Sequence, residues 1–182
     1  LWLGWQRIST HLLYYSEEAI SVVVAFRNEV EKLPALLDSF CRINYDLSKV
    51  HFIFVNDHST DQFLEVFERS VYSELHIQCI NLEPQQFGKK QALRKGVEHA
   101  RTKWVMLTDA DCEVSANWVG AMLSTIKQNT LARFVFGPVR FLEKHSFLMD
   151  FQTIDFLSLI GSGAALWQWK RPVMCNGANL LV

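Results

Sequence analysis

Two aspartates stand one residue apart where an apolar run of the sequence ends. The run "WVMLT" stops at Asp109, and Asp111 follows with only Ala110 between them. In an extended chain, side chains two positions apart point the same way, so both carboxylates would face one side. Two carboxylates held together repel each other unless a cation lies beside them. Because Mg²⁺ and Mn²⁺ prefer oxygen ligands and also take phosphate oxygens, the pair predicts a divalent-metal site next to a diphosphate.

The same pair has a purely structural alternative. One aspartate would cap a helix that begins near residue 116, and the other would be solvated. A motif of three residues decides little when it stands alone. The metal interpretation therefore depends on what the rest of the sequence places beside Asp109 and Asp111.

Polar residues also follow three other apolar runs. The runs "AISVVVAF", "HFIFV" and "HIQCINL" each lead into a polar group. These groups are Arg27-Asn28-Glu29, Asn56-Asp57-His58 and Gly88-Lys89-Lys90. In an open parallel sheet, ligands bind beyond the carboxyl ends of the strands, so all four groups would meet at one edge. Any one of them could be a cap or a turn, but four together are hard to explain as caps.

The elements that would position these groups alternate along the chain. Apolar runs rich in β-branched residues predict strands at 19–26, 51–55, 76–82, 103–109 and 132–141. Apolar residues at helical spacing predict helices at 29–43, 59–71, 88–100 and 117–128. Pro34 fits the first turn of the first helix, and Ser59 with Gln62 fits a capping box. The alternation predicts an α/β domain with a mostly parallel central sheet and helices on both faces.

Two apolar segments flank this pattern. Residues 145–169 form a long apolar stretch, interrupted by Asp150 and Asp155, that predicts a helix. We expect this helix to lie over the sheet rather than at a membrane surface, which is the alternative. The opening stretch "LWLGWQRISTHLLYY" places aromatic residues beside a basic one, as at the interfacial edge of a membrane helix. An amphipathic helix packed on the domain explains that stretch equally well.

Composition and motif spacing exclude several other classes of protein. The chain has 182 residues, 49% of them hydrophobic, so it can form a sizeable core. A net charge of −1 gives no support for broad nucleic-acid binding. The four cysteines form no CxxC pair, which argues against zinc or a disulfide framework. A P-loop would need glycine where Glu83 stands and serine or threonine where Lys90 stands, and no Rossmann glycine fingerprint follows the first strand.

Four motifs together resemble one known family. The stretches "ISVVVAFRNEVEKLPALLDSF", "FIFVNDHSTDQ", "GKKQALRKGVEHA" and "WVMLTDADCEVSANWV" resemble, in order and spacing, the family 2 glycosyltransferases. The resemblance covers residues 19–142, with a looser match at "NGANLLV". It implies the GT-A (Rossmann-like) fold and transfer of a sugar, with inversion, from a nucleotide-diphosphate donor to an acceptor hydroxyl.

The resemblance also implies roles for individual residues. Asp57 would accept a hydrogen bond from the base, usually uracil, and Lys89 would lie near the phosphates. Asp109 would face the ribose and the metal, and Asp111 would ligate the metal, which is Mg²⁺ or Mn²⁺. The full nucleotide-sugar-binding set that it implies is Ala25, Phe26, Arg27, Glu29, Asp57, Lys89, Asp109, Ala110 and Asp111.

The chain departs from the family pattern in two places. His58 stands where the family commonly has a turn glycine, and histidine tolerates that backbone conformation better than a β-branched residue does. The family's general base, an aspartate in an "ED" motif that follows the "NGAN" region, has no match here, and we expect it beyond Val182. We interpret Asp150 and Asp155 as polar-face residues of a helix, not as its substitutes.

The expected organisation has three parts. Residues 1–18 would be an N-terminal extension, either membrane-proximal or packed on the domain, 19–142 the nucleotide-sugar-binding GT-A subdomain, and 143–182 the truncated start of an acceptor-binding subdomain. The acceptor would be a saccharide or a lipid-linked molecule of a cell-envelope polysaccharide. We expect the full-length protein at the cytoplasmic face of a membrane and without nucleic-acid partners. The alternatives are a nucleotidyltransferase and a catalytically inactive sugar-nucleotide-binding module.

Overall fold

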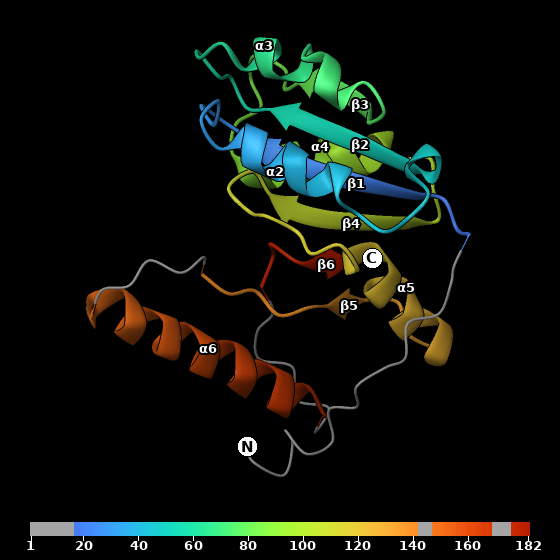
Figure 1. Cartoon of the computed structure of the whole chain (residues 1–182), viewed down its shortest axis with the longest axis vertical. Coiled ribbons are helices and arrows are strands. Elements are labelled where there is room, and N and C mark those ends of the chain that lie inside the picture. Colours follow the sequence, from blue (N-terminus) through green and yellow to red (C-terminus); the bar gives the residue numbers. More distant parts are fainter. Residues whose placement is uncertain (1–16, 142–146, 169–175) are drawn as a thin grey trace.

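A six-stranded sheet forms the centre of the molecule in a computed structural model that describes residues 17–141, 147–168 and 176–182 (Figure 1). The strands are β1 Ile20–Phe26, β2 Val50–Asn56, β3 His76–Asn81, β4 Trp104–Asp109, β5 Val135–Phe136 and β6 Leu180–Leu181. Their order in the sheet is β3-β2-β1-β4-β6-β5. Strands β1 to β4 are parallel, and β6 runs antiparallel to both β4 and β5. The predicted α/β class with a mostly parallel sheet is therefore confirmed.

The central strand β1 explains why its sequence is apolar without alternation. It pairs along its length with β2, from Ile20 opposite Val50 to Phe26 opposite Asn56, and with β4 on its other side. Its side chains are buried on both faces of the sheet. A strand covered on both faces reads as a continuous apolar run, which is what residues 20–26 show.

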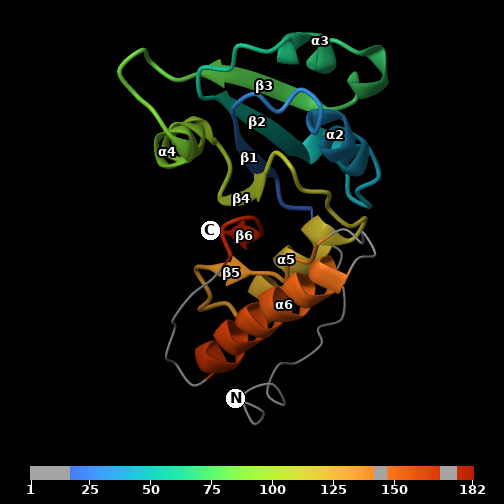
Figure 2. The ribbon, with the colours of Figure 1, turned by 90° about the vertical axis from the view of Figure 1, so that its left-hand side faces the viewer.

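Helices cover the two faces of the sheet (Figure 2). Helices α2 (Leu33–Cys41) and α5 (Trp118–Gln128) lie on one face, and α4 (Lys89–His99) lies on the other. Phe40, Phe52 and Phe54 belong to the larger core, on the α2 face. On the α4 face, Gly96 lies so close to Val23 that a Cβ atom there would collide with its side chain. The expected helices on both faces are confirmed.

The predicted helix at 59–71 is wrong. The structure has a single turn of helix, α3 (Phe63–Phe67), and a 3-10 turn, η2 (Ser70–Tyr72). The capping box also fails, because Gln62 is the N-cap and makes no side-chain cap bond. The Ser59 hydroxyl instead accepts a hydrogen bond from the Asn28 amide at 3.0 Å, so it stabilises the turn after β1. A further 3-10 turn, η1 (Leu47–Lys49), precedes β2.

The C-terminal elements differ from the expectation in two ways. The strand predicted at 132–141 is only β5, two residues long. Helix α6 (Phe147–Gln168) exists, but it lies beyond β5 and does not cover the parallel strands (Figures 1 and 2). The reason is that α2, α5 and α4 already occupy both faces of the sheet. Within the described ranges, no helix has the length and hydropathy for a membrane crossing. Residues 1–16 of the predicted N-terminal extension lie outside the described residues.

Candidate functional site

One cleft of about 240 Å³ opens at the carboxyl ends of β1, β2 and β4. Its lining contains all nine residues that the sequence placed in the nucleotide-sugar site. They are Ala25, Phe26, Arg27, Glu29, Asp57, Lys89, Asp109, Ala110 and Asp111. The parallel strands bring them together, because residues that follow each strand reach the same edge of the sheet. Their individual roles remain predictions.

The two aspartates after β4 have different surroundings. Asp109 Oδ1 forms an ion pair with Lys89 Nζ at 2.6 Å, and the Asp109 side chain is 26% exposed. Asp111 is exposed and forms no ion pair with the residues that the structure describes. Helix α5 has Asn117 as its N-cap, so the alternative in which Asp109 or Asp111 caps this helix is wrong. Neither carboxylate caps α5, and both line the cleft.

The segment after Asp111 is held by contacts with α2 and with the residues that follow α2. The Val114 amide donates to the Ser39 hydroxyl at 3.1 Å, and the Asn44 amide donates to the Ala116 carbonyl at 2.7 Å. The Cys112 amide closes the turn by donating to the Asp109 carbonyl at 3.2 Å. These bonds fix the backbone that carries the acidic pair.

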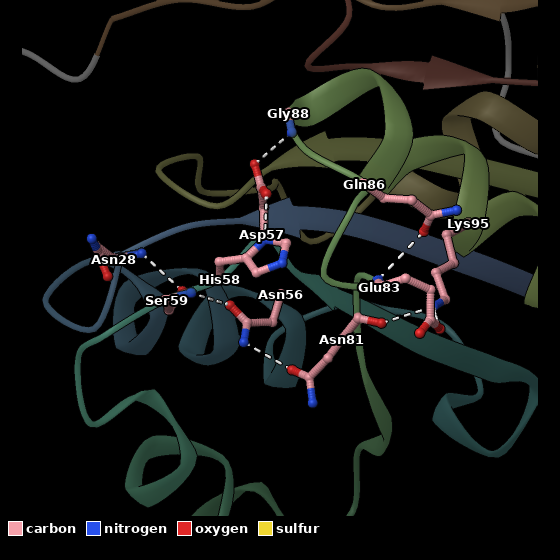
Figure 3. Close-up of polar contacts among 10 residues, drawn as sticks. All are labelled: Asn28, Asn56, Asp57, His58, Ser59, Asn81, Glu83, Gln86, Gly88 and Lys95. Carbon is pink, nitrogen blue, oxygen red and sulfur yellow. Dashed lines mark hydrogen bonds and ion pairs between the residues drawn. The ribbon is translucent and has the colours of Figure 1, made fainter.

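Asp57 joins the end of β2 to the beginning of α4 (Figure 3). Its Oδ2 atom accepts a hydrogen bond from the Gly88 amide at 2.9 Å, and its Oδ1 atom contacts His58 Nδ1 at 3.1 Å. The residue is only 6% exposed. A carboxylate at a helix N-terminus is favoured by the exposed amides and the helix dipole there. Asp57 is therefore fixed in place while it lines the cleft.

The turns after β1 and β2 are bonded to each other. Asn28 has a φ of 56° and its Oδ1 atom accepts from the Thr60 amide at 2.8 Å. Asp61 Oδ2 accepts from the Val30 amide at 2.9 Å. His58 has a φ of 58°, the left-handed conformation expected where the family commonly has glycine. These bonds hold the backbone on either side of the cleft.

Positive charge gathers where α4 begins. Lys89 and Lys90 occupy the first turn of this helix, where the dipole disfavours cations. The ion pair with Asp109 offsets this cost for Lys89. Arg27, which directly follows β1, is exposed and has no ion pair in the described part of the chain. An anionic ligand in the cleft would meet Lys89 and Arg27 at one edge.

The acidic pair fits a Mg²⁺-type ion bound together with phosphate. Across the described residues, no group of three or more histidine, cysteine or acidic side chains could hold a metal alone. Mg²⁺ is commonly held by one or two carboxylates plus substrate phosphates, which Asp109 and Asp111 match. Burial, and then the Asp111 and Asp109 charges, raise the pKa of the Cys112 thiol, and Cys112 does not line the cleft. The ligand set therefore consists of hard oxygen atoms.

Sequence reasoning missed several residues around the cleft. Phe87 stacks on His58, with ring centroids 4.6 Å apart, and Ser39 reaches the segment after β4 from α2. Asn179, in the "NGAN" stretch, accepts from Trp118 Nε1 at 2.8 Å and donates to the Pro138 carbonyl at 2.9 Å. No local pattern marks Phe87 or Ser39, because their partners are distant in sequence. Only Asn179 carried a signal, through the loose family match.

Fold and site together define a glycosyltransferase of family 2. Residues 21–174 match the family model described as "Glycosyl transferase family 2", and the chain belongs to this family. Among its curated relatives is the poly-beta-1,6-N-acetyl-D-glucosamine synthase of Staphylococcus epidermidis, 31% identical over 145 residues. The match covers 79% of this chain and 34% of that protein. The synthase of Staphylococcus aureus strain COL is also 31% identical, over 144 residues. The chain thus spans about a third of the length of these relatives.

Solved structures confirm the GT-A fold. A mannosyltransferase from Pyrobaculum calidifontis, PcManGT, solved with GDP-Man and Mn²⁺, has a TM-score of 0.68 and 18% identity. The match covers 99% of this chain and 50% of that one. Staphylococcus aureus TarS 1–349, solved with UDP-GlcNAc, has a TM-score of 0.59 and 19% identity, covering 69% of this chain and 37% of that one. At these identities the likeness establishes the fold alone.

Proposed function

We propose that this chain is the nucleotide-sugar-binding part of an inverting glycosyltransferase that uses a UDP-sugar with Mg²⁺ or Mn²⁺. The observation that carries the proposal is the single cleft that gathers Asp57, Lys89, Asp109 and Asp111. A nucleotide-sugar donor requires three kinds of partner. It needs a hydrogen-bond acceptor for the base, a cation for the phosphates, and a pair of oxygen ligands for the metal.

Asp57 suits the recognition of a uracil base. Each of its carboxylate oxygens has one partner, Gly88 or His58, and keeps a second lone pair. Uracil offers an N–H donor that such an oxygen can accept. Because Asp57 is buried and already oriented, it would bind the base without much loss of side-chain freedom.

Lys89, Arg27 and the acidic pair suit a diphosphate. Asp109 and Asp111 would hold the metal, which supplies positive charge against the negative charge that grows on the leaving nucleoside diphosphate. Lys89 already lies 2.6 Å from Asp109, so its ammonium is next to the phosphate position implied by that pair. The exposed Arg27 guanidinium, which also lines the cleft, would bind further phosphate oxygens.

The acceptor would lie on the side of the C-terminal elements. In the proposed division, residues 19–142 bind the donor and 143–182 begin the acceptor-binding part, with the general base beyond Val182. The base would take the proton of the acceptor hydroxyl, and the oxygen would attack the anomeric carbon opposite the diphosphate. By similarity to the synthases, we propose a saccharide or lipid-linked acceptor of a cell-envelope polysaccharide and action at the cytoplasmic face of a membrane.

Membership of family 2 argues against a nucleotidyltransferase. An inactive sugar-nucleotide-binding module remains the second candidate, since it would share the cleft and lack only the base. Transfer by the full-length protein to a saccharide acceptor would exclude it.

Calorimetry with UDP tests the proposal. We expect binding in Mn²⁺ or Mg²⁺ that a chelator weakens, and Asp111→Asn should lose this dependence on metal. Asp57→Asn should weaken UDP by about 1.5–3 kcal/mol, the range for hydrogen bonds to charged groups. The matched control is Asp150→Asn on α6, at an exposed carboxylate that does not line the cleft. Equal binding with chelator would contradict the role of Asp111, and unchanged affinity in Asp57→Asn would contradict base recognition.

A further inference from the structure

His58 and Phe87 form a contact beside the cleft that the proposed function does not use. Their rings stack with centroids 4.6 Å apart and planes inclined by 23°. Neither residue lines the cleft. Phe87 is 59% exposed, so burial of its ring in a core does not explain its position. The contact joins the turn after β2 to the segment that enters α4.

A second contact joins the same two segments. Asp57, the neighbour of His58, accepts the amide hydrogen of Gly88, the neighbour of Phe87, at 2.9 Å. The dipeptides Asp57-His58 and Phe87-Gly88 therefore meet at two points, which we call the double contact. One contact would allow the segments to pivot, whereas two fix their relative orientation. Figure 3 shows the Asp57 half of this arrangement.

The imidazole also links the two halves of the double contact. His58 Nδ1 lies 3.1 Å from Asp57 Oδ1, and because a carboxylate oxygen accepts, Nδ1 is the donor. Nε2 is buried and finds no hydrogen-bond partner in the described part of the chain. The polar contact of the ring is therefore directed at Asp57 alone. Stacking on Phe87 restrains the ring, and the ring in turn restrains the carboxylate.

The double contact includes one residue of the cleft and directly precedes another. Asp57 is the proposed base acceptor, and Lys89, which follows Gly88 directly, is the proposed phosphate ligand. His58 and Gly88 both adopt positive φ, 58° and 89°, and for a histidine this conformation persists only when surrounding contacts hold it. A shift of Phe87-Gly88 would move Lys89 away from Asp109 and remove the amide partner of Asp57.

We propose that His58 and Phe87 are positioning residues that hold Asp57 and Lys89 in the geometry that receives the nucleotide. The inference rests on the proposed function, because it concerns the same nucleotide site. It assigns no catalytic role to either residue. As a consequence, an exposed phenylalanine outside the cleft contributes to the affinity of the cleft for UDP.

The experiment compares Phe87→Leu, Phe87→Tyr, His58→Asn and the double variant Phe87→Leu/His58→Asn. Asparagine is chosen at His58 because it tolerates the left-handed backbone. UDP affinity is measured by calorimetry with Mn²⁺, and amide hydrogen exchange is followed by NMR without nucleotide. Phe151→Leu on α6, at a phenylalanine with 63% exposure, is the matched control. The Val30 amide, bonded to Asp61 in a neighbouring turn, is the internal control for exchange.

We expect Phe87→Leu and His58→Asn each to weaken UDP by about 2–12-fold, which corresponds to the strength of an aromatic pair. The double variant should be no weaker than the weaker single variant, because both changes remove the same stacking contact, and the His58 contact with Asp57 is already lost in His58→Asn. Phe87→Tyr should bind as the wild type does. In both single variants the Gly88 amide should exchange faster, while the Val30 amide should not change.

Unchanged UDP affinity or unchanged Gly88 exchange in Phe87→Leu would overturn the inference, and so would additive losses in the double variant. If the wild type itself fails to bind UDP, the proposed function is wrong, and Gly88 exchange then decides whether the double contact exists. If the wild type binds UDP but Gly88 does not respond, the positioning role is wrong and the proposed function stands.

Discussion

The four parallel strands and the C-terminal elements are held together in different ways. Strands β1 to β4 have six or seven residues each, whereas β5 and β6 have two. Side chains from the parallel strands are buried against helices on both faces. Helix α6 instead leaves four large apolar side chains on the surface: Phe151, Ile154, Leu157 and Leu159. The cleft is therefore built by the part of the molecule with the most extensive packing, and its geometry does not depend on α6.

The largest expected effect is the loss of a buried side chain from the parallel strands, which tests how tightly this region is packed. Phe54 is fully buried in β2 and its ring lies 4.8 to 6.4 Å from those of Phe26, Phe40 and Phe67. Phe54→Ala should lower the free energy of unfolding by about 3–5 kcal/mol, because it leaves a cavity in the core. Urea denaturation measures this loss.

Phe151→Ala on α6 is the matched control for Phe54→Ala. Its side chain is 63% exposed, so the expected change is within about 0.5 kcal/mol. Similar losses at the two positions would break the comparison, since they would show that α6 is packed as firmly as β2.

A smaller effect is expected where the two regions meet. Asn179→Ala removes the acceptor of Trp118 Nε1 and the donor to the Pro138 carbonyl. An unpaired buried donor costs about 1–3 kcal/mol, so the variant should unfold at lower urea concentration than the wild type. UDP affinity should stay the same, because Asn179 does not line the cleft. Weaker UDP binding would show that the C-terminal elements shape the cleft after all.

The smallest effect concerns the segment before α4. Lys95 Nζ contacts Glu83 Oε1 at 2.7 Å and the Asn81 carbonyl at 2.8 Å. The pair with Lys95 lowers the pKa of Glu83. A carboxyl with a lowered folded pKa adds stability above its unfolded pKa and loses it as pH falls through the folded value.

The melting temperature of Lys95→Met should therefore be slightly lower than that of the wild type at neutral pH. The difference should shrink in acid, once Glu83 is protonated in both proteins. Thermal unfolding across this pH range measures it. Arg94→Met, which breaks the exposed pair of Arg94 with Glu98, is the matched control and should melt at a temperature close to that of the wild type. A difference between Lys95→Met and wild type that grows in acid would contradict the assigned pair.

The fold of the parallel strands could be predicted because its signal is local. Runs such as residues 20–26 are apolar without alternation, which identifies strands buried on both faces. Parallel strands share one carboxyl edge, so the order of the runs along the chain is enough to assign the residues after each run to one site. This is why spacing and resemblance place Asp57, Lys89 and Asp109 in one cleft, while their roles in binding stay predictions.

The remaining features depend on contacts between distant residues. The sequence predicts Ser59 as a helix cap, but its hydroxyl accepts a hydrogen bond from the Asn28 amide instead. The helix predicted at 59–71 is only α3 in the structure. Helix α6 reads as a cover for the sheet, yet α2, α5 and α4 leave it no face to cover. No pattern in the neighbouring sequence singles out Phe87, because its contact is with the ring of His58, which is distant in the sequence. Competition among tertiary partners decides such cases, and propensity does not.

The position of β6 has a consequence for the order of folding. Leu181 pairs with Met106 in β4 and with Val135 in β5, so the strand latest in sequence lies between two earlier ones. A ribosome delivers the chain from its N-terminus, and β1 to β4 emerge well before β6. Until β6 arrives, β4 presents an unpaired edge that another chain could join. The cleft at the ends of β1, β2 and β4 can therefore be complete during synthesis, while protection of the β4 edge against aggregation waits for the insertion of β6.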